Sequence, residues 1–275
     1  TVFWDDAACQ VKMIDQRVLP ARLEIVACAS PAEVADAIRN MTVRGAPAIG
    51  ASAAFGMALA GLQSPADGLR DWQGHMRKAA VLLKSTRPTA VNLAWAVDRI
   101  MRIVELDQPL AALRQQVLAE AQHIANEDVA VNKRMAEWGS TLIDDGDTII
   151  HHCNTGALAT VDWGTALGVI RTAHEQGKRI FVLVDETRPR LQGARLTAWE
   201  LQQYGIPYAI ISDGAVGHFL RTGQAQKVFF GADRVAANGD VANKVGTYML
   251  ALAAHSNDVP VYAVAPSSSI DLSIQ

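Results

Sequence analysis

Two residues that can exchange protons lie at the ends of short apolar runs in the second half of the chain. Cys153 ends the run 148–153, and Asp233 follows the run 228–230 after a Gly-Ala pair. A helix N-terminus or a nearby cation can stabilise a thiolate at such a position, and partial desolvation favours the neutral, proton-donating form of a carboxyl. Cys153 and Asp233 are therefore candidates for acid–base chemistry. A buried structural cysteine and an aspartate paired with Arg234 are the ordinary alternatives.

Polar or charged turns follow all five apolar runs that are typical of strands. These runs cover residues 148–153, 179–184, 208–211, 228–230 and 259–264. In open α/β sheets, ligands bind at the carboxyl ends of the strands, so five polar turns predict one site at that edge of a sheet. The turn at Asn154, Thr155 and Gly156 either presents backbone N–H groups to an anion or forms an ordinary helix cap.

Basic residues next to helical patterns are candidates for holding an anionic group. Arg44 precedes a small-residue stretch at 46–62, and Arg87 lies between two helical patterns. Arginine suits bidentate contacts with phosphate, although a single arginine is usually a solvated surface charge. Asn243 and Lys244 are predicted to open a helix, where a lysine opposes the helix dipole and therefore favours an anionic ligand.

The periodicity of the apolar residues predicts the elements that position these groups. In the first half the pattern is helical, and Ser30 and Glu33 form a capping box. In the second half helical segments alternate with the five strands, which predicts βαβ units and a mainly parallel sheet. The helical patterns cover 46–62, 68–84, 90–105, 109–143, 165–177, 194–204, 214–221 and 243–255. We predict an α/β fold with a mostly helical N-terminal domain at 1–115, followed at 116–275 by a long helix and a Rossmann-like, mainly parallel α/β catalytic domain.

Composition narrows the class of protein. The 275 residues are 50% hydrophobic, and 25 basic against 28 acidic residues leave a net charge of −3, which offers no electrostatic case for nucleic acid. Three cysteines without a Cys-x-x-Cys pair predict neither a disulfide framework nor a zinc knuckle. The N-terminus shows no signal-peptide pattern and no apolar run reaches about 18 residues, so we expect a cytoplasmic protein without membrane association.

Several kinds of site are disfavoured by missing motifs. No predicted strand is followed by the Gly-x-Gly-x-x-Gly of a Rossmann dehydrogenase, and the Gly-x-Ser-x-Gly elbow of a hydrolase is absent from the sequence. No metal-ligand spacing links His151, His152 and His218, which lie near predicted strand ends or turns, so we expect no metal site. The last predicted strand ends at Val264 and the sequence stops soon after it, at Gln275, which we interpret as a shortened C-terminal end.

Six ordered segments resemble the methylthioribose-1-phosphate isomerase family, and the resemblance runs from about Trp4 to the last residue. The segments are RGAPAIG at 44–50, HCNTGALA at 152–159, DETRP at 185–189, QGARLT at 192–197, GADR at 231–234 and NKVGT at 243–247. The resemblance implies an aldose–ketose isomerase of methionine salvage that converts 5-methylthioribose 1-phosphate into 5-methylthioribulose 1-phosphate. It also implies a homodimer and no metal or nucleotide cofactor.

The resemblance further implies a role for individual residues. Cys153 and Asp233 would be the catalytic pair. The implied substrate contacts are Arg44, Gly45, Ala46, Arg87, Gln192, Asn243 and Lys244. Because the anomeric oxygen is phosphorylated, an acid must help the ring oxygen leave, and hydrogen must move from C2 to C1. A neutral Asp233 as the acid and a Cys153 thiolate as the shuttle meet that need, and a hydride shift between C2 and C1 is the open alternative.

Relatives in the same superfamily leave other functions open. Some act on ribose 1,5-bisphosphate or 5-deoxyribose 1-phosphate, and others are non-catalytic regulatory subunits of a translation-initiation exchange factor. A bisphosphate substrate is expected to need a second cluster of cations, and the sequence identifies none. Cys153 and Asp233, each in its full motif, argue against a regulatory scaffold, which has no chemical need for a strand-end thiol opposite a strand-end acid.

Overall fold

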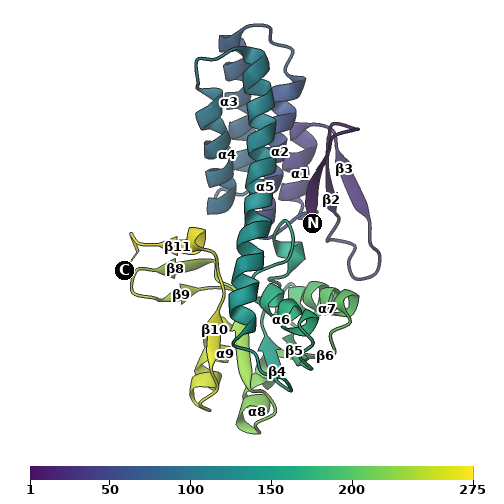
Figure 1. Cartoon of the computed structure of the whole chain (residues 1–275), viewed down its shortest axis with the longest axis vertical. Helices are drawn as coiled ribbons and strands as arrows, with labels where there is room; N and C mark the ends of the chain where they lie inside the picture. Colours follow the sequence, from purple (N-terminus) through teal and green to yellow (C-terminus); the bar gives the residue numbers. More distant parts are fainter. Residues whose placement is uncertain (275) are drawn as a thin grey trace. The chain divides into compact units, whose positions relative to one another are not determined.

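The computed structural model describes residues 1–274, which form two compact units (Figure 1). Unit 1 contains Thr1–Val129 and Ala159–Val161, and unit 2 contains Ala130–Leu158 and the chain from Asp162 onward. The division falls within α5 (Leu110–Ser140), so the predicted long helix contributes its first part to unit 1 and its last part to unit 2. Unit 2 holds a parallel five-stranded sheet, which confirms the predicted α/β fold class.

Unit 1 opens with a three-stranded antiparallel sheet that the helical patterns of the first half did not predict. Its strands are β1 (Val2–Asp5), β2 (Gln10–Ile14) and β3 (Ile25–Cys28), with β2 in the centre. Val11 and Met13 are fully buried while their neighbours in β2 are half-buried, the alternation of a strand with one face in the core. The strands span only 4 or 5 residues, which is too few for this alternation to stand out in the sequence.

Helices form most of the rest of unit 1. They are α1 (Pro31–Arg39), α2 (Ala46–Gln63), α3 (Leu69–Ser85), α4 (Val91–Val104) and the first part of α5. The capping box is confirmed, because the Glu33 N–H donates to Ser30 Oγ at 3.2 Å and the Ala29 N–H donates to Glu33 Oε2 at 2.7 Å. α2, α3 and α4 begin and end, and α5 begins, within a few residues of the bounds that the periodicity predicts.

The small-residue stretch becomes α2, the central helix of unit 1. Its alanines and glycines are buried on nearly all sides, because small side chains let neighbouring helices approach closely. Among residues 1–274, α2 is the one helix whose length and apolar composition would suffice to cross a membrane, so the expectation that no apolar run reaches about 18 residues is wrong. Of that stretch, 78% is buried inside the structure, as in the core helix of a bundle.

The sheet of unit 2 has five parallel strands in the order β10–β7–β4–β5–β6. These strands are β4 (Thr148–His151), β5 (Phe181–Asp185), β6 (Tyr208–Ile211), β7 (Lys227–Phe230) and β10 (Val261–Ala263), so all five predicted strands are present. The chain runs outward from β4 through β5 to β6, and then places β7 on the other side of β4. The strand order therefore reverses between β4 and β7, and this reversal is where such sheets bind ligands.

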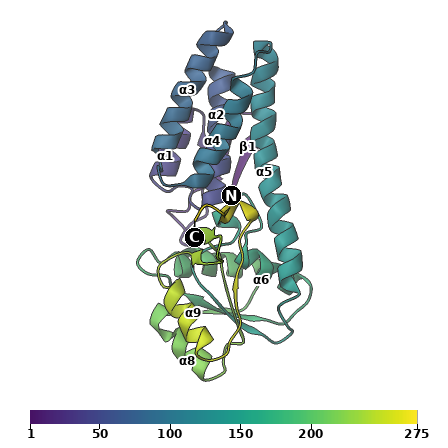
Figure 2. The ribbon, with the colours of Figure 1, turned by 90° about the vertical axis from the view of Figure 1, so that its left-hand side faces the viewer.

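Helices cover both faces of this sheet. They are α6 (Ala166–Glu175), α7 (Ala198–Tyr204), α8 (Val216–Arg221) and α9 (Thr247–His255). In β4, Ile149 packs in one apolar cluster with α6 and α7, whereas the adjacent Ile150 packs in another with α8 and α9, which lie side by side in Figure 2. Because successive residues are buried on opposite faces, the central strands appear in the sequence as continuous apolar runs.

One predicted helix start is wrong. Asn243 and Lys244 do not open a helix, because α9 begins at Thr247. The chain before them forms two strands of a small third sheet, β8 (Arg234–Ala236) and β9 (Val241–Ala242). β8 also pairs with β11 (Ile270–Asp271), near the C-terminus. Asn243 and Lys244 lie in the short segment between β9 and α9.

Candidate active site

Cys153 and Asp233 follow the two strands that meet at the reversal of the sheet. β4 and β7 are neighbours in parallel register, with His151 opposite Phe229. The turns after both strands therefore open at the same edge. Asp233 is exposed, with its N–H donating to Ala242 O at 2.9 Å. The predicted desolvation of Asp233 is wrong, because this residue lies beyond the buried end of β7.

Hydrogen bonds hold the backbone of Cys153 in an uncommon conformation. Cys153 is 9% exposed and has φ +71°, in the left-handed region. Its N–H donates to Thr187 Oγ1 at 2.9 Å, and Thr197 Oγ1 donates to its carbonyl oxygen at 2.7 Å. A non-glycine residue in this region costs roughly 1–3 kcal/mol and persists where neighbouring contacts enforce it. Thr187 and Thr197 are thus site residues that the sequence did not reveal as such, although both stand in the quoted motifs.

Gln192 is the predicted substrate contact that touches Cys153. Its Nε2 donates to Cys153 Sγ at 3.4 Å, and a donor aimed at sulfur stabilises negative charge that develops there. Its Oε1 is buried and has no hydrogen-bond partner within residues 1–274. A buried carbonyl oxygen without a donor is costly, so a ligand hydroxyl placed beside Cys153 would satisfy it.

The turn at Asn154–Gly156 is already occupied by an anionic side chain of the protein itself. Asn154 Nδ2 donates to Glu200 Oε1 at 2.7 Å, and the Leu158 N–H donates to Glu200 Oε2 at 3.3 Å. A Cβ added at Gly156 would lie 2.3 Å from Glu200 Oε2. The buried side chain of Glu200 therefore lies where an external anion would approach Gly156, which disfavours the interpretation of this turn as an anion site.

Next to Cys153, the ring of His152 bridges two segments. Its Nδ1 lies 2.7 Å from Asp185 Oδ2, and its Nε2 donates to Val245 O at 3.0 Å. Burial raises the pKa of Asp185 to about 6, and this carboxyl raises the pKa of His152 although burial opposes the charged imidazolium. Burial also lowers the pKa of the neighbouring His151 to about 3, so that this second ring is neutral.

Three potential metal-ligating groups cluster here although no sequence spacing links them. One atom each of His152, Asp185 and Asp213 lies within 4.8 Å of the other two. Both oxygens of Asp213 accept backbone N–H groups, from Thr187 and Arg188, at 2.7 Å each. Hydrogen bonds account for the cluster without a cation.

The Asn243–Lys244 segment is tied to the start of α9. Asn243 Nδ2 donates to Thr247 Oγ1 at 3.0 Å, and this hydroxyl donates to Lys244 O at 2.6 Å. Both residues are half-buried. The carbonyl that accepts from His152 belongs to Val245, the next residue, so this predicted substrate segment is fixed directly to the turn that carries Cys153.

The remaining predicted contacts, Arg44, Gly45, Ala46 and Arg87, belong to unit 1. Gly45 caps α2 with φ +93°, and a Cβ there would lie 2.2 Å from Ala159 O, so only glycine fits. The first turns of α2 and α4 touch, because a Cβ on Gly50 would lie 3.0 Å from Asn92 O. Arg44 and Arg87 precede these turns and therefore lie at the same end of the bundle, where helix N-termini favour anions.

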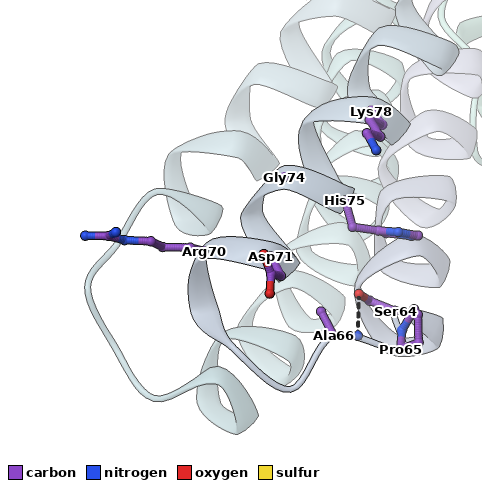
Figure 3. A pocket seen from close by; sticks show the side chains of 8 residues that line it. All are labelled: Ser64, Pro65, Ala66, Arg70, Asp71, Gly74, His75 and Lys78. Atoms are coloured by element: carbon purple, nitrogen blue, oxygen red, sulfur yellow. Dashed lines mark hydrogen bonds between the residues drawn. The ribbon is translucent and has the colours of Figure 1, made fainter.

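A surface depression of about 410 Å³ lies elsewhere in unit 1, between the end of α2 and the start of α3 (Figure 3). It is lined by Ser64, Pro65, Ala66, Arg70, Asp71, Gly74, His75 and Lys78. None of these is a predicted site residue, and Arg70 points away from the others. The depression lies at the opposite end of α2 from Arg44, and the chemistry of the site gives no reason to include it.

The chain is similar to proteins of known function. Residues 42–275 match the model of the Initiation factor 2 subunit family. Methylthioribose-1-phosphate isomerase from Synechococcus sp. is 53% identical over 266 residues, 96% of this chain and 76% of that protein. The enzyme of the same description from Thermosipho africanus is 52% identical over 260 residues, 94% of this chain and 75% of that protein.

Solved structures agree with these relatives. The 5-methylthioribose 1-phosphate isomerase from Pyrococcus horikoshii superposes with a TM-score of 0.96 at 45% identity, over 100% of this chain and 77% of that one. The translation initiation factor eIF-2B, subunit delta, from A. fulgidus superposes with a TM-score of 0.91 at 44% identity, over 100% and 79% of the two chains. The chain belongs to the Initiation factor 2 subunit family, and within it to the group of the methylthioribose-1-phosphate isomerases.

Proposed function

We propose that the chain converts 5-methylthioribose 1-phosphate into 5-methylthioribulose 1-phosphate, with Cys153 and Asp233 as the catalytic pair. The observation that carries the proposal is the placement of Cys153 at the reversal between β4 and β7, with the Gln192 amide 3.4 Å from its sulfur. The relatives at about half identity that are described as this isomerase support the choice of substrate.

The mechanism divides the work between an acid and a proton shuttle. Asp233 protonates the ring oxygen while the bond from this oxygen to C1 breaks. The Cys153 thiolate removes the proton from C2, which leaves an enol phosphate, and returns it to C1. The C2 hydroxyl gives its own proton to the carboxylate of Asp233 and becomes the ketone. Because Asp233 is exposed, the bound sugar must exclude water from it to favour its neutral form.

The remaining predicted residues bind the substrate in this proposal. Arg44, with the backbone of Gly45 and Ala46 at the start of α2, and Arg87 offer donors to a phosphate. Gln192, Asn243 and Lys244 supply amide and ammonium groups on the side of Cys153. The proposal requires no metal or nucleotide cofactor, and it places the chain in methionine salvage, in the cytoplasm, as a homodimer whose mass sedimentation would measure.

The test is an NMR assay of the purified protein with 5-methylthioribose 1-phosphate. The wild type forms the ketose, whereas Cys153→Ser and Asp233→Asn, folded as judged by circular dichroism, form none. Turnover by either variant at the wild-type rate would remove that residue from the mechanism. With deuterium at C2, loss of the label to solvent establishes the proton shuttle and excludes the hydride shift. Complete retention at C1 favours the hydride shift over a shuttle that exchanges with water.

A second candidate function is that of a sugar-phosphate-binding subunit, which the similarity to the translation initiation factor from A. fulgidus brings into consideration. Binding of 5-methylthioribose 1-phosphate in calorimetry without any turnover would favour it. Turnover of ribose 1,5-bisphosphate or 5-deoxyribose 1-phosphate in preference to the methylthio sugar would instead change the substrate and keep the reaction.

A further inference from the structure

A buried histidine–aspartate pair adjoins Cys153, and no step of the proposed mechanism uses it. The side chains of His152 and Asp185 are 0% and 1% exposed. His152 Nδ1 lies 2.7 Å from Asp185 Oδ2, and Nε2 lies 3.0 Å from Val245 O. Both ring nitrogens are therefore engaged, one by a strand end and the other by the segment that carries Asn243 and Lys244.

The partners of the ring determine how many protons it holds. A carbonyl oxygen only accepts, so Nε2 must carry a hydrogen that it donates to Val245 O. Without a second hydrogen, Nδ1 and a carboxylate oxygen would be two acceptors facing each other at 2.7 Å. One further proton must lie between His152 and Asp185, as imidazolium with carboxylate or as imidazole with carboxylic acid, and the pair is neutral in both forms.

The surroundings favour retention of this shared proton. Asp213 and Glu186 add negative charge around Asp185. The neighbouring His151, in β4, adds no opposing positive charge, because burial lowers its pKa. Burial raises the pKa of Asp185, and Asp185 raises the pKa of His152. The second oxygen of Asp185, Oδ1, is buried without a hydrogen-bond partner within residues 1–274. Burial of this oxygen costs more free energy when Asp185 is a full carboxylate than when the carboxyl holds or shares a proton.

Two chains of contacts lead from the pair to the site. On one side, Gly246 packs so tightly on the ring that an added Cβ would lie 2.7 Å from Cε1. On the other, the Asp185 carbonyl oxygen accepts from Thr187 Oγ1 at 3.1 Å, and Thr187 Oγ1 accepts the Cys153 N–H at 2.9 Å. The pair thus joins the segment before α9 to the backbone of Cys153.

From this geometry we infer that His152 and Asp185 are positioning residues that share one proton. Together they hold the Asn243–Lys244 segment at a fixed position relative to Cys153. The inference deepens the proposed function and rests on it for the identity of the substrate. Substrate binding would then require the pair to keep its proton, because loss of that proton sets two acceptors against each other and releases the ring.

Nuclear magnetic resonance tests the shared proton without any activity. The full chain carries ¹⁵N-labelled histidine, and His152→Asn assigns the resonances of His152 by their absence. We expect Nε2 to stay protonated from about pH 5 to 9, with a low-field proton at Nδ1 that Asp185→Asn removes. Titration of the ring as a free imidazole near pH 6.5 would overturn the inference. A shift of the His152 signals alone on addition of Zn²⁺ would overturn it in favour of a metal site.

Kinetics with 5-methylthioribose 1-phosphate tests the positioning role. His152→Asn keeps a partner for Asp185 but cannot reach Val245 O, so KM should rise about tenfold, the equivalent of one lost hydrogen bond, with kcat changed less. In the wild type, loss of the shared proton should lower kcat/KM at high pH. Asp185→Asn can donate from its amide to Nδ1 without this proton, so KM should stay near the wild-type value and the fall of kcat/KM at high pH should disappear.

Two kinetic outcomes contradict the role. One is a loss of kcat in His152→Asn at unchanged KM, and the other is a high-pH limb in Asp185→Asn that coincides with that of the wild type. If the wild type does not turn over this sugar, the proposed function fails, whereas the resonance experiment still decides whether the pair holds its proton.

Discussion

Adding one methyl group at Gly246 tests the contact between the segment before α9 and the His152 ring. Gly246 has φ +103°, and an added Cβ would lie 2.7 Å from Cε1 of the ring. Ordinary contact begins at 3.4 Å, so the ring or the segment must move by about 0.7 Å. Gly239 is the matched control, because it has φ +90° and no atom within 4 Å of an added Cβ.

The two substitutions share one energetic cost and differ in another. Backbone strain costs roughly 1–3 kcal/mol for alanine at either position. Only Gly246→Ala also displaces the ring from Asp185 and Val245, which weakens two hydrogen bonds of about 0.5–1.5 kcal/mol each. Gly246→Ala should therefore lower the free energy of unfolding by about 1–3 kcal/mol more than Gly239→Ala. Displacement of the Asn243–Lys244 segment should also raise KM about tenfold.

Urea denaturation and steady-state kinetics with 5-methylthioribose 1-phosphate measure the two quantities separately. Gly239→Ala should lower the free energy of unfolding and leave KM within about threefold of the wild type, a shift of under 1 kcal/mol. Equal KM values for the two variants, with Gly246→Ala folded, would refute the reasoning, because the ring would then move without consequence for the substrate segment.

Three further predictions concern His151 and Gly156 beside the site and Lys227 at the start of β7. Lys227→Met removes the ammonium that lies 2.6 Å from the buried Asp147 and should lower the free energy of unfolding in urea by roughly 3 kcal/mol, since an unpaired buried carboxylate remains. His151 stays neutral in the fold and charges in the unfolded chain, so wild-type stability falls below pH 6.5. His151→Gln should remove up to about 1.4 kcal/mol per pH unit of that fall. Gly156→Ala places a methyl group 2.3 Å from Glu200 Oε2 and should lower both stability and the soluble yield.

Two of these predictions have a control variant in the same unit. Arg179→Met breaks an ion pair with Asp145 that is largely exposed, so it should change the free energy of unfolding little. Gly217→Ala, in α8 with no atom within 4 Å of an added Cβ, should be neutral or slightly stabilising. Equal effects of Lys227→Met and Arg179→Met, or of the two glycine variants, would contradict the burial arguments. Parallel pH slopes of wild type and His151→Gln would contradict the third.

The elements of the fold were predictable where the signal is local. All five strands of unit 2 appear as apolar runs, because each is buried on both faces. The capping box at Ser30 begins α1 as predicted. β1, β2 and β3 were missed because an alternation over 4 or 5 residues is too short to recognise. The start of α9 was misplaced because Gly246, with φ +103°, delays it beyond Lys244.

Local runs and turns are enough to predict which residue types stand at the ends of strands, including Cys153 after β4 and Asp233 after β7. The packing of the folded chain is what places β7 beside β4, Glu200 against the turn after Cys153, and His152 against Asp185 and Val245. These contacts join residues 33, 46 and 93 positions apart. No local period encodes them, because the partners of a buried polar group are selected by the packing of the whole sheet, which leaves few donors within reach.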